Sequence, residues 1–368
     1  HIVGSPNSDK PPMENCYNVG TVKGGTTYTG GIAGYADRSI SIKSCYNDVN
    51  GVVTGGSGQY TGGVLGCVGN SVTLEACFNK GIVNGHTGND VGGVLGGAYA
   101  YNSLLIDCYN EGAVTGGSGQ NTGGVMGSIT NRTGMKNCYN TGTVTGGSGH
   151  RIGGLAGEIN TSVWNNYGRL QNCYNTGDMI ANGGNYVGGI AGYVSGLPES
   201  IGTFYNTGSI KSDAAAVGGI AGFLQPGQRL TACFNGGLIE AKGAGAIVGD
   251  GFKANENCYY LEESIDNPMD GDFIKAFTPE ALASGEAAYL LNGGSQERND
   301  LWSQGETGPV FAGEGKQPIY KIWVEDGITF GNVELEKEYV EAKSQVTPSI
   351  TPEEGYVLQL LTGKGNRP

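Results

Sequence analysis

The chain has 368 residues, of which 70 are glycine, and a formal net charge of −13. The negative charge opposes binding to nucleic acid, and the glycines do not recur at every third position as collagen requires. No apolar run of about 18 residues exists to cross a bilayer and no basic amphipathic stretch exists to lie on one, so we expect no membrane insertion.

Residues 1–15 are polar, contain Pro11 and Pro12 and carry no motif. We interpret them as an N-terminal lead-in. The first residues do not resemble a signal peptide, and the chain ends in sequence that is still rich in strand-forming residues. We therefore expect a monomeric fragment of a longer protein.

From residue 16 to residue 260 the chain repeats with a period of about 30 residues. The repeat has two signatures, and one of them is the pentad Gly-Gly-aliphatic-aliphatic-Gly. With a degenerate last copy, it occurs at residues 30–34, 62–66, 92–96, 123–127, 153–157, 188–192, 218–222 and 245–249. The other signature is Cys-aromatic-Asn, which begins at Cys16, Cys45, Cys77, Cys108, Cys138, Cys173 and Cys233, with variant copies at Phe204 and Cys258. Such a period is typical of solenoids.

Each repeat predicts three short strands. The first ends in Cys-aromatic-Asn, the second is centred on an aliphatic residue such as Val53 or Val83, and the third is the pentad. Gly and Asn bound these strands, and no segment of the repeat has a helical period. We predict an all-β fold, a parallel β-helix or β-solenoid of about eight rungs in which identical side chains stack along the axis.

The residue types of the repeat have expected roles. Pentad glycines permit positive φ and close approach of neighbouring backbone. The Asn after each aromatic residue can adopt the left-handed conformation and can bond to its counterpart on the next rung. Counting by two from Leu74 buries Ala76 and Phe78, whereas a bend before the asparagine buries Cys77. The pattern leaves this orientation open.

Eight of the nine cysteines share one repeat position. Parallel strands on adjacent rungs lie about 4.8 Å apart, close enough in principle for disulfides, but a ladder in strict register does not naturally give disulfide geometry. We predict free thiols that pack as small apolar side chains. Cys67 follows a pentad and has no counterpart in other repeats, so it is either a filler residue or a pairing partner.

The aromatic residues of the repeat form a column that is our candidate ligand-binding site, represented by Tyr46, Phe78, Tyr109, Tyr139 and Tyr174. The simpler interpretation is that these rings pack in the core. The functional interpretation is a row of exposed rings that stacks on sugars or on a partner chain.

Charged and helix-forming residues become more frequent after residue 260, and we expect 261–324 to form a small α+β capping module. Its helix is expected within 273–292, with Thr278 as N-cap, Pro279 at the first position and Gly293 after the end. The module is expected to cover the open end of the solenoid, where strand edges would otherwise be unpaired.

The last part of the chain, residues 325–368, has alternating apolar runs typical of a short β-sandwich-like module or its first part. Between it and the helix, Trp302, Val310 and the segment 319–322 predict one hairpin or two short strands.

No residue set typical of catalysis, cofactor binding or metal binding is evident, so we expect none of these sites. His1, His86 and His150 lack a partner at a triad spacing, no Cys-x-x-Cys occurs, and both His86 and His150 are interpreted as solvated loop residues. The acids of the repeats do not cluster by repeat position, although a site formed by two converging loops remains an alternative. These acids are Asp37, Asp48, Glu75, Asp90, Asp107, Glu111, Glu158, Asp178 and Asp213.

The repeat resembles the GLUG-motif repeat of bacterial surface proteins, in which Cys-Tyr-Asn-x-Gly-x-Val and Gly-Gly-aliphatic-x-Gly alternate. The resemblance covers about residues 16–260. Phe204, Ala246 and Tyr260 depart from the motif and are interpreted as degenerate rungs. The stretch 284–292 is similar to a module that often closes such arrays, and the tail resembles strand-rich repeats of Gram-positive cell-wall proteins.

The resemblance implies an extracellular, modular protein located at the bacterial cell surface or cell wall. We expect a non-catalytic scaffold or adhesin that binds host glycan, mucin or another extracellular protein. The alternatives are a carbohydrate-active β-helix enzyme, either lyase or glycosidase, and a non-catalytic segment of a large secreted protease. The family supplies no catalytic residue to carry over to this chain.

Overall fold

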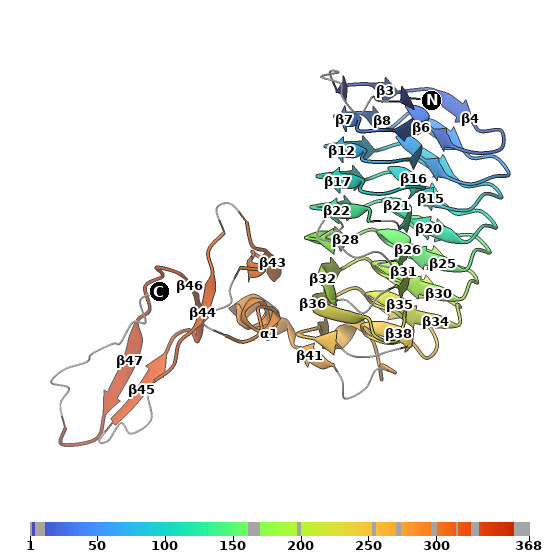
Figure 1. The fold of residues 1–368 in the computed structure, drawn as a ribbon. Helices are drawn as coiled ribbons and strands as arrows, with labels where there is room; N and C mark the ends of the chain where they lie inside the picture. Colours follow the sequence, from blue (N-terminus) through green and yellow to red (C-terminus); the bar gives the residue numbers. More distant parts are fainter. Residues whose placement is uncertain are drawn as a thin grey trace. The chain divides into compact units, whose positions relative to one another are not determined.

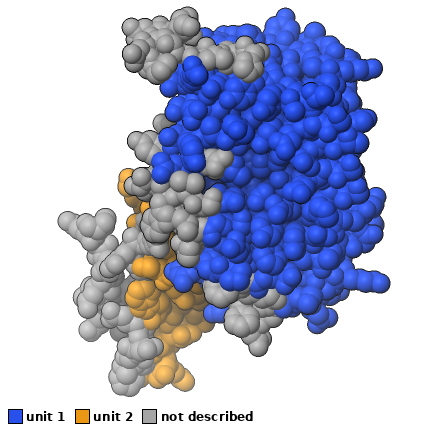
Figure 2. Space-filling view, turned by 45° about the vertical axis from the view of Figure 1, so that its right-hand side comes forward, with its two compact units in different colours: residues 1–278 blue, residues 279–368 orange. Residues whose placement is uncertain are grey.

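The computed structural model describes residues 2–3, 12–130, 132–160, 170–196, 200–251, 255–269, 274–295, 300–313, 316–324 and 331–356. The chain forms two compact units, residues 1–278 and residues 279–368, which Figure 2 colours separately. The first unit is a parallel β-solenoid of about eight turns (Figure 1), as the repeat predicts.

Five parallel sheets run along the solenoid, and most turns contribute one strand to each. We number them 1 to 5 in the order in which the chain passes through them within a turn. The prediction of three strands per repeat is therefore wrong, because a typical turn has five. Two of the expected strands are each divided by a bend, the first between sheets 1 and 2 and the pentad between sheets 4 and 5.

Sheets 1 and 2 hold the segments on either side of the bend before each cysteine. Sheet 1 consists of β2 (Met13–Glu14), β7 (Ser41–Lys43), β12 (Thr73–Glu75), β17 (Leu104–Ile106), β22 (Gly134–Lys136) and β27 (Leu170–Gln171). Sheet 2 consists of β3 (Tyr17–Asn18), β8 (Tyr46–Asn47), β13 (Phe78–Asn79), β18 (Tyr109–Asn110), β23 (Tyr139–Asn140), β28 (Cys173–Asn175), β32 (Ser200–Asn206), β36 (Arg229–Asn235), β40 (Tyr259–Leu261) and β41 (Lys275–Phe277), with β39 (Asn255–Glu256) also paired to β36.

Sheet 3 holds the aliphatic strand of each repeat. It consists of β4 (Thr21–Lys23), β9 (Val52–Thr54), β14 (Ile82–Asn84), β19 (Val114–Thr115), β24 (Val144–Gly146), β29 (Met179–Ala181), β33 (Ile210–Ser212) and β37 (Ile239–Glu240).

Sheets 4 and 5 hold the two sides of the pentad. Sheet 4 consists of β5 (Thr29–Gly30), β10 (Thr61–Gly62), β15 (Val91–Gly92), β20 (Asn121–Gly123), β25 (Arg151–Gly153), β30 (Tyr186–Gly188) and β34 (Ala216–Gly218). Sheet 5 consists of β1 (Ile2–Val3), β6 (Ala33–Asp37), β11 (Leu65–Val68), β16 (Leu95–Ala98), β21 (Met126–Ile129), β26 (Ala156–Asn160), β31 (Ala191–Ser195), β35 (Ala221–Leu224) and β38 (Val248–Gly251).

Pentad glycines are required for close approach and not for positive φ. Among the described residues, no pentad glycine lies in the left-handed region, so that part of the expectation is wrong. A Cβ on Gly93 would overlap the carbonyl oxygen of Gly124 on the next turn and the side chain of Asn110. The second glycine of the pentad therefore packs directly against the asparagine column.

The solenoid interior has two apolar regions. The larger cluster includes Leu74, Cys77 and Leu95, from the side of sheets 1 and 5. Smaller clusters, which include Val144 and Ile152, lie between sheets 3 and 4. The asparagine column and the pentad glycines meet between these regions, so a polar seam divides the core along the solenoid axis.

The second unit contains two short helices, α1 (Pro279–Ser284) and α2 (Glu286–Leu291), where one helix is expected. The helix breaks at Gly285, whose φ of 92° is left-handed. The predicted start at Pro279 is confirmed, and Gly293 follows α2 with a φ of 95°. Whether this unit covers the end of the solenoid stays a prediction.

Three antiparallel pairs complete the second unit. They are β42 (Trp302–Gln304) with β43 (Pro309–Phe311), β44 (Ile319–Lys321) with β46 (Tyr339–Glu341), and β45 (Gly331–Leu335) with β47 (Pro348–Pro352). The side chain of Asn292 accepts hydrogen bonds from the backbone N–H groups of Leu301 and Trp302 and donates one to the carbonyl of Trp302, which joins α2 to the first pair.

The borders of the compact units differ from the borders expected from composition. The strand β41 adds one more strand to sheet 2, so residues up to 278 belong to the solenoid unit. The pair β44–β46 joins residues on either side of the border expected near residue 325. No helix among the described residues is long and apolar enough to span a membrane.

Candidate binding face

The aromatic column lies on the outside of sheet 2. Tyr46, Phe78, Tyr109, Tyr139 and Tyr174 are half-buried, while the cysteine and the asparagine on either side of each ring are buried. Of the two interpretations that the sequence leaves open, packing of the rings in the core is therefore wrong for these five positions. Further along the column, Phe234 is buried, and at the other end Tyr17 is 61% exposed.

A left-handed residue before each cysteine sets this orientation. Ala76 has a φ of 51°, and its counterparts in the other turns also have positive φ. This bend interrupts the alternation of a strand, so that Leu74 and Cys77, three residues apart, both face the core. Phe78 then faces outward and Asn79 inward. The asparagine itself is in a strand, so the left-handed conformation expected for it belongs instead to the residue before the cysteine.

The rings of the column stack on one another from turn to turn. From Tyr46 to Tyr205, successive ring centroids are 4.6 to 4.9 Å apart and the ring planes differ by 2° to 7°. Tyr17 stacks on Tyr46 at 5.5 Å. Ring faces are thus occupied by the neighbouring rings, and the column presents ring edges and phenol hydroxyls to solvent. We call this surface the ladder face.

Ion pairs flank the ladder face on both sides. On one side Lys80 Nζ lies 3.1 Å from Glu111 Oε2 and 5.5 Å from the centroid of the Phe78 ring. On the other side Lys43 Nζ lies 2.9 Å from Glu75 Oε2. Each pair joins two successive turns, but exposed pairs of this kind contribute at most about 1 kcal/mol. They give the face a balanced charge.

The phenols of Tyr109, Tyr139 and Tyr174 stay uncharged at physiological pH. Burial raises the pKa of Tyr139 to about 12, and it also raises the pKa of Tyr109 and of Tyr174. The ladder face therefore offers a row of neutral hydroxyl groups that both donate and accept hydrogen bonds.

Behind the rings, buried asparagines form a continuous hydrogen-bonded ladder. In each step the Nδ2 of one asparagine donates to the Oδ1 of the next, over 2.6 to 2.9 Å, from Asn18 to Asn235. Each Nδ2 also donates to a backbone carbonyl on its own turn, as Asn110 does to Gly112. The expected bonding from rung to rung is confirmed, and it fixes the register that stacks the rings.

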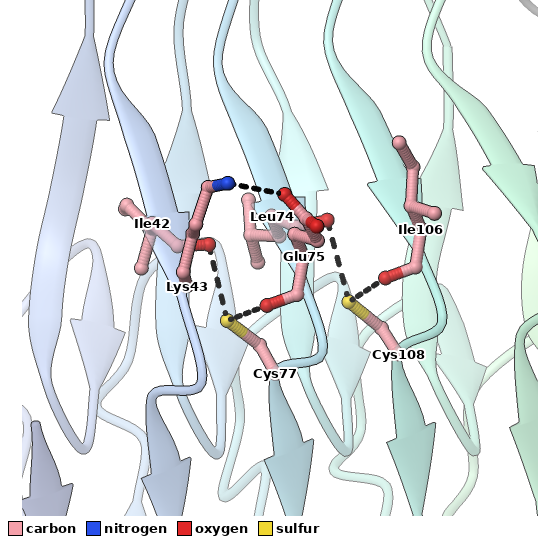
Figure 3. A network of polar contacts seen from close by, with 7 residues as sticks. All are labelled: Ile42, Lys43, Leu74, Glu75, Cys77, Ile106 and Cys108. Carbon is pink, nitrogen blue, oxygen red and sulfur yellow. Dashed lines mark hydrogen bonds and ion pairs between the residues drawn. The ribbon is translucent and has the colours of Figure 1, made fainter. Parts of the chain in front are cut away.

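The cysteine column satisfies backbone carbonyls inside the core. Cys77 Sγ lies 3.4 Å from the carbonyl oxygen of Ile42 on the preceding turn and 3.5 Å from that of Glu75 (Figure 3). Cys108 repeats this arrangement with Leu74 and Ile106. All nine cysteines are free thiols, as predicted, and burial raises the pKa of Cys108.

Cys67 is a filler residue and has no disulfide partner. It is buried on the outer side of sheet 5, in the column that holds Tyr35 on the preceding turn. Burial raises the pKa of its thiol to about 12. The two histidines of the solenoid loops, His86 and His150, are exposed, as expected.

Two acids that occupy different repeat positions are brought together by the fold. Asn121 Nδ2 donates to Asp90 Oδ1 over 2.7 Å and lies 3.4 Å from Glu158 Oε2. Glu158 also pairs with Arg151. The expectation that the acids do not cluster is wrong here, because sheets 4 and 5 are adjacent across the pentad and so place residues from different repeat positions side by side.

Two columns of the repeat indicate this polar site in the sequence, although the repeated motifs do not include them. The residue two places before each pentad and the residue directly after it change from turn to turn, whereas the cysteine and asparagine columns of the core stay nearly constant. Asp90 and Asn121 belong to the first of these columns and Glu158 to the second.

Searches of protein-family models, of curated proteins and of solved structures found no match to this chain. Within the described residues, no group of three or more His, Cys, Asp or Glu side chains is arranged to hold a metal ion.

Proposed function

We propose that this protein is a non-catalytic scaffold or adhesin of a bacterial cell surface, of the GLUG-repeat type, and that its ladder face binds host glycan or extracellular protein. The observation that carries the proposal is the unbroken stack of rings from Tyr17 to Tyr205 on the outside of the solenoid. A regular row of half-buried tyrosines supplies rigid contact area together with hydroxyl groups.

The geometry of the stack favours one type of partner. Sugar rings bind tyrosine by lying on an open ring face, and these faces are occupied inside the stack. Edges and hydroxyls remain, at a repeat near 4.8 Å that matches successive rungs of parallel strands. The ladder face thus suits a flat or extended partner that lies along the solenoid, such as an extracellular protein surface or a linear glycan.

The test is binding of the full chain to a panel of host glycans, mucins and extracellular matrix proteins, measured by biolayer interferometry. The double variant Tyr109→Ala/Tyr139→Ala is expected to bind about tenfold more weakly or worse, because aromatic side chains contribute much of the binding free energy of an interface. The control is Ile82→Ala/Ile180→Ala, which removes exposed apolar side chains from sheet 3. Equal loss in both variants, or no binding by the wild type, contradicts the proposal.

A carbohydrate-active enzyme is the second candidate, and the proximity of Asp90 and Glu158 favours it. Glycosidases use two carboxyl groups, one protonated and one ionised, and burial raises the pKa of Asp90. Its test is release of reducing ends or of unsaturated sugars from a polysaccharide panel. Activity that Glu158→Gln and Asp90→Asn abolish would establish the enzyme and exclude the non-catalytic scaffold.

A further inference from the structure

Two neighbouring columns on the outside of the solenoid do not keep the repeat residue. The first, two places before the pentad, contains Tyr28, Tyr60, Asp90, Asn121, Arg151 and Tyr186. The second, directly after the pentad, contains Tyr35, Cys67, Gly97, Ser128, Glu158 and Tyr193. We call them together the variable strip. The cysteine and asparagine columns of the core keep their residue in nearly every turn, whereas these two columns change in size and polarity.

A hollow lies in the middle of the variable strip. Three successive turns carry the small residues Cys67, Gly97 and Ser128 at a position where neighbouring turns carry Tyr35 and Tyr193. Near this column lies a depression of about 380 Å³, lined in part by Tyr60, Asp90, Tyr99, Asn121, Ser128 and Glu158. Small-molecule sites occupy about 300 to 1,000 Å³.

One polar group in this hollow has no partner. Asn121 is 6% exposed, and its Nδ2 donates hydrogen bonds to Asp90 and Glu158. Its Oδ1 is buried and accepts no hydrogen bond. Leaving a buried acceptor unsatisfied is costly. An O–H or N–H group of a ligand would remove that cost.

Each charged group in the hollow already has a partner. Glu158 is paired with Arg151, and Asp90 accepts hydrogen bonds from Asn121 and Ser128. Neither a cation nor an anion therefore finds an unpaired opposite charge. At the rim, Tyr60 packs over the backbone of Gly97, and Tyr99 is 66% exposed. Rings beside neutral hydrogen-bonding groups suit a ligand that carries both hydroxyl groups and an apolar C–H face.

We propose that this hollow binds an uncharged saccharide unit, whose hydroxyl group donates to Asn121 Oδ1 while the tyrosines at the rim cover its C–H face. The site is separate from the ladder face and lies on sheets 4 and 5. The inference deepens the proposed binding function, on which it rests for its extracellular setting, by adding a ligand class and a second location.

The test uses the full chain with glucose, galactose, mannose, fucose, N-acetylglucosamine and N-acetylgalactosamine, by saturation-transfer NMR and calorimetry. The wild type is expected to bind at least one of them, and Asn121→Ala to weaken that binding about tenfold. Ser128→Tyr is expected to abolish it by filling the hollow. The Ser128→Tyr variant is expected to fold, because Tyr35 and Tyr193 occupy the same register position in other turns.

The matched control is Phe223→Ser, which changes the same column outside the hollow and is expected to leave the affinity unchanged. Circular dichroism checks the fold of each variant. No binding by the wild type, or equal binding by wild type and Ser128→Tyr, overturns the inference.

The two proposals fail separately. In one outcome, a host glycan, mucin or matrix protein binds through Tyr109 and Tyr139 but no monosaccharide binds. This result supports the proposed function and refutes the saccharide site. Monosaccharide binding that Ser128→Tyr abolishes, with no effect of the Tyr109→Ala/Tyr139→Ala variant on any partner, supports the site and refutes the role of the ladder face.

Discussion

In each turn, one residue with positive φ precedes the cysteine and turns the chain from sheet 1 into sheet 2. Asparagine fills this position in several turns, at Asn137 and Asn172 for example, but Ala76 fills it in another. Alanine has no side-chain hydrogen bond to stabilise the left-handed conformation, which costs roughly 1 to 2 kcal/mol for ordinary residues. The cost is tolerated because the bend places both Leu74 and Cys77 in the core.

Replacing Ala76 by asparagine is therefore expected to stabilise the solenoid. The free energy of unfolding should rise by about 1 kcal/mol, since asparagine adopts the left-handed conformation more readily. In the same column, Asn137 donates from Nδ2 to Asp107 on the preceding turn. An asparagine at position 76 has Asp107 as its neighbour on the next turn, so it is expected to form a similar hydrogen bond. Urea denaturation followed by circular dichroism measures the change. Ala76→Val, with a β-branched side chain at the same φ, should shift stability the other way.

Asp90 gives the solenoid a predictable pH dependence. Burial raises its pKa in the folded state above the ordinary value of 3.8. The folded state then binds its proton more tightly than the unfolded state, so the contribution to stability is fully present below about pH 3.8 and is lost as the pH rises through the folded pKa.

Asp90→Asn removes this loss and is expected to raise the melting temperature at pH 7. The difference from the wild type should shrink as the pH falls through the folded-state pKa and then below 3.8, where the wild-type carboxyl becomes protonated in both states. Differential scanning calorimetry at several pH values measures it. Asp178→Asn, an exposed acid of another column, serves as the control. A constant difference across this pH range would mean that the ionisation of Asp90 does not contribute.

At the scale of the strand and its neighbours, the asparagine ladder sets the register. Asn140 is fully buried, accepts from Asn110, and donates to Asn175 and Gly142. No apolar residue can replace those contacts, because a donor and an acceptor on the adjacent turns would be left unpaired. The second glycine of each pentad then follows from the ladder, since only glycine leaves room for the asparagine beside it.

Asn140→Leu is expected to lower the free energy of unfolding by roughly 2 to 5 kcal/mol, from two orphaned polar groups and the overlap with the glycine column. The matched control is Thr141→Ala at the exposed neighbouring position, which should change stability by less than about 0.5 kcal/mol. Chemical denaturation distinguishes them. A loss as small as that of the control would show that the ladder contributes little to stability.

The sequence predicts the elements of the solenoid better than its surface sites. Cys-aromatic-Asn and the pentad mark every turn, because core positions must repeat for turns to stack. The bend before the cysteine was harder to predict, because Ala76, Asp107 and Asn137 all have positive φ but have chemically different side chains. The hollow was missed because Asp90, Asn121 and Glu158, which line it, occupy columns that change from turn to turn, and a search for repeated residues ignores such columns.

For the whole solenoid, the repeat makes each turn a unit that contacts only its neighbours. Gly123 and Gly153 occupy the same position on adjacent turns. Deleting residues 124–153 joins Gly123 to Gly154, as the natural chain joins Gly153 to Gly154, and should leave a folded solenoid that is shorter by one rung of about 4.8 Å.

Small-angle scattering and far-ultraviolet circular dichroism check this deletion, which should keep the β-sheet content per residue and a cooperative thermal transition. Deleting residues 124–138 instead removes half a turn and joins unlike positions, so it should unfold the neighbouring turns. Equal behaviour of the two deletions would show that register between turns is not what holds the solenoid together.

The asparagine ladder also gives the solenoid an electrical direction. Every step from Asn18 to Asn235 donates toward the C-terminal turn, and the last amide lies 3.4 Å from Ser264 Oγ. The side-chain amide dipoles therefore add head to tail along the axis, as peptide dipoles do in an α-helix, and each polarises the next. One end of the column is relatively negative and the other relatively positive, so two such solenoids stacked end to end attract in the same orientation and repel when one is reversed.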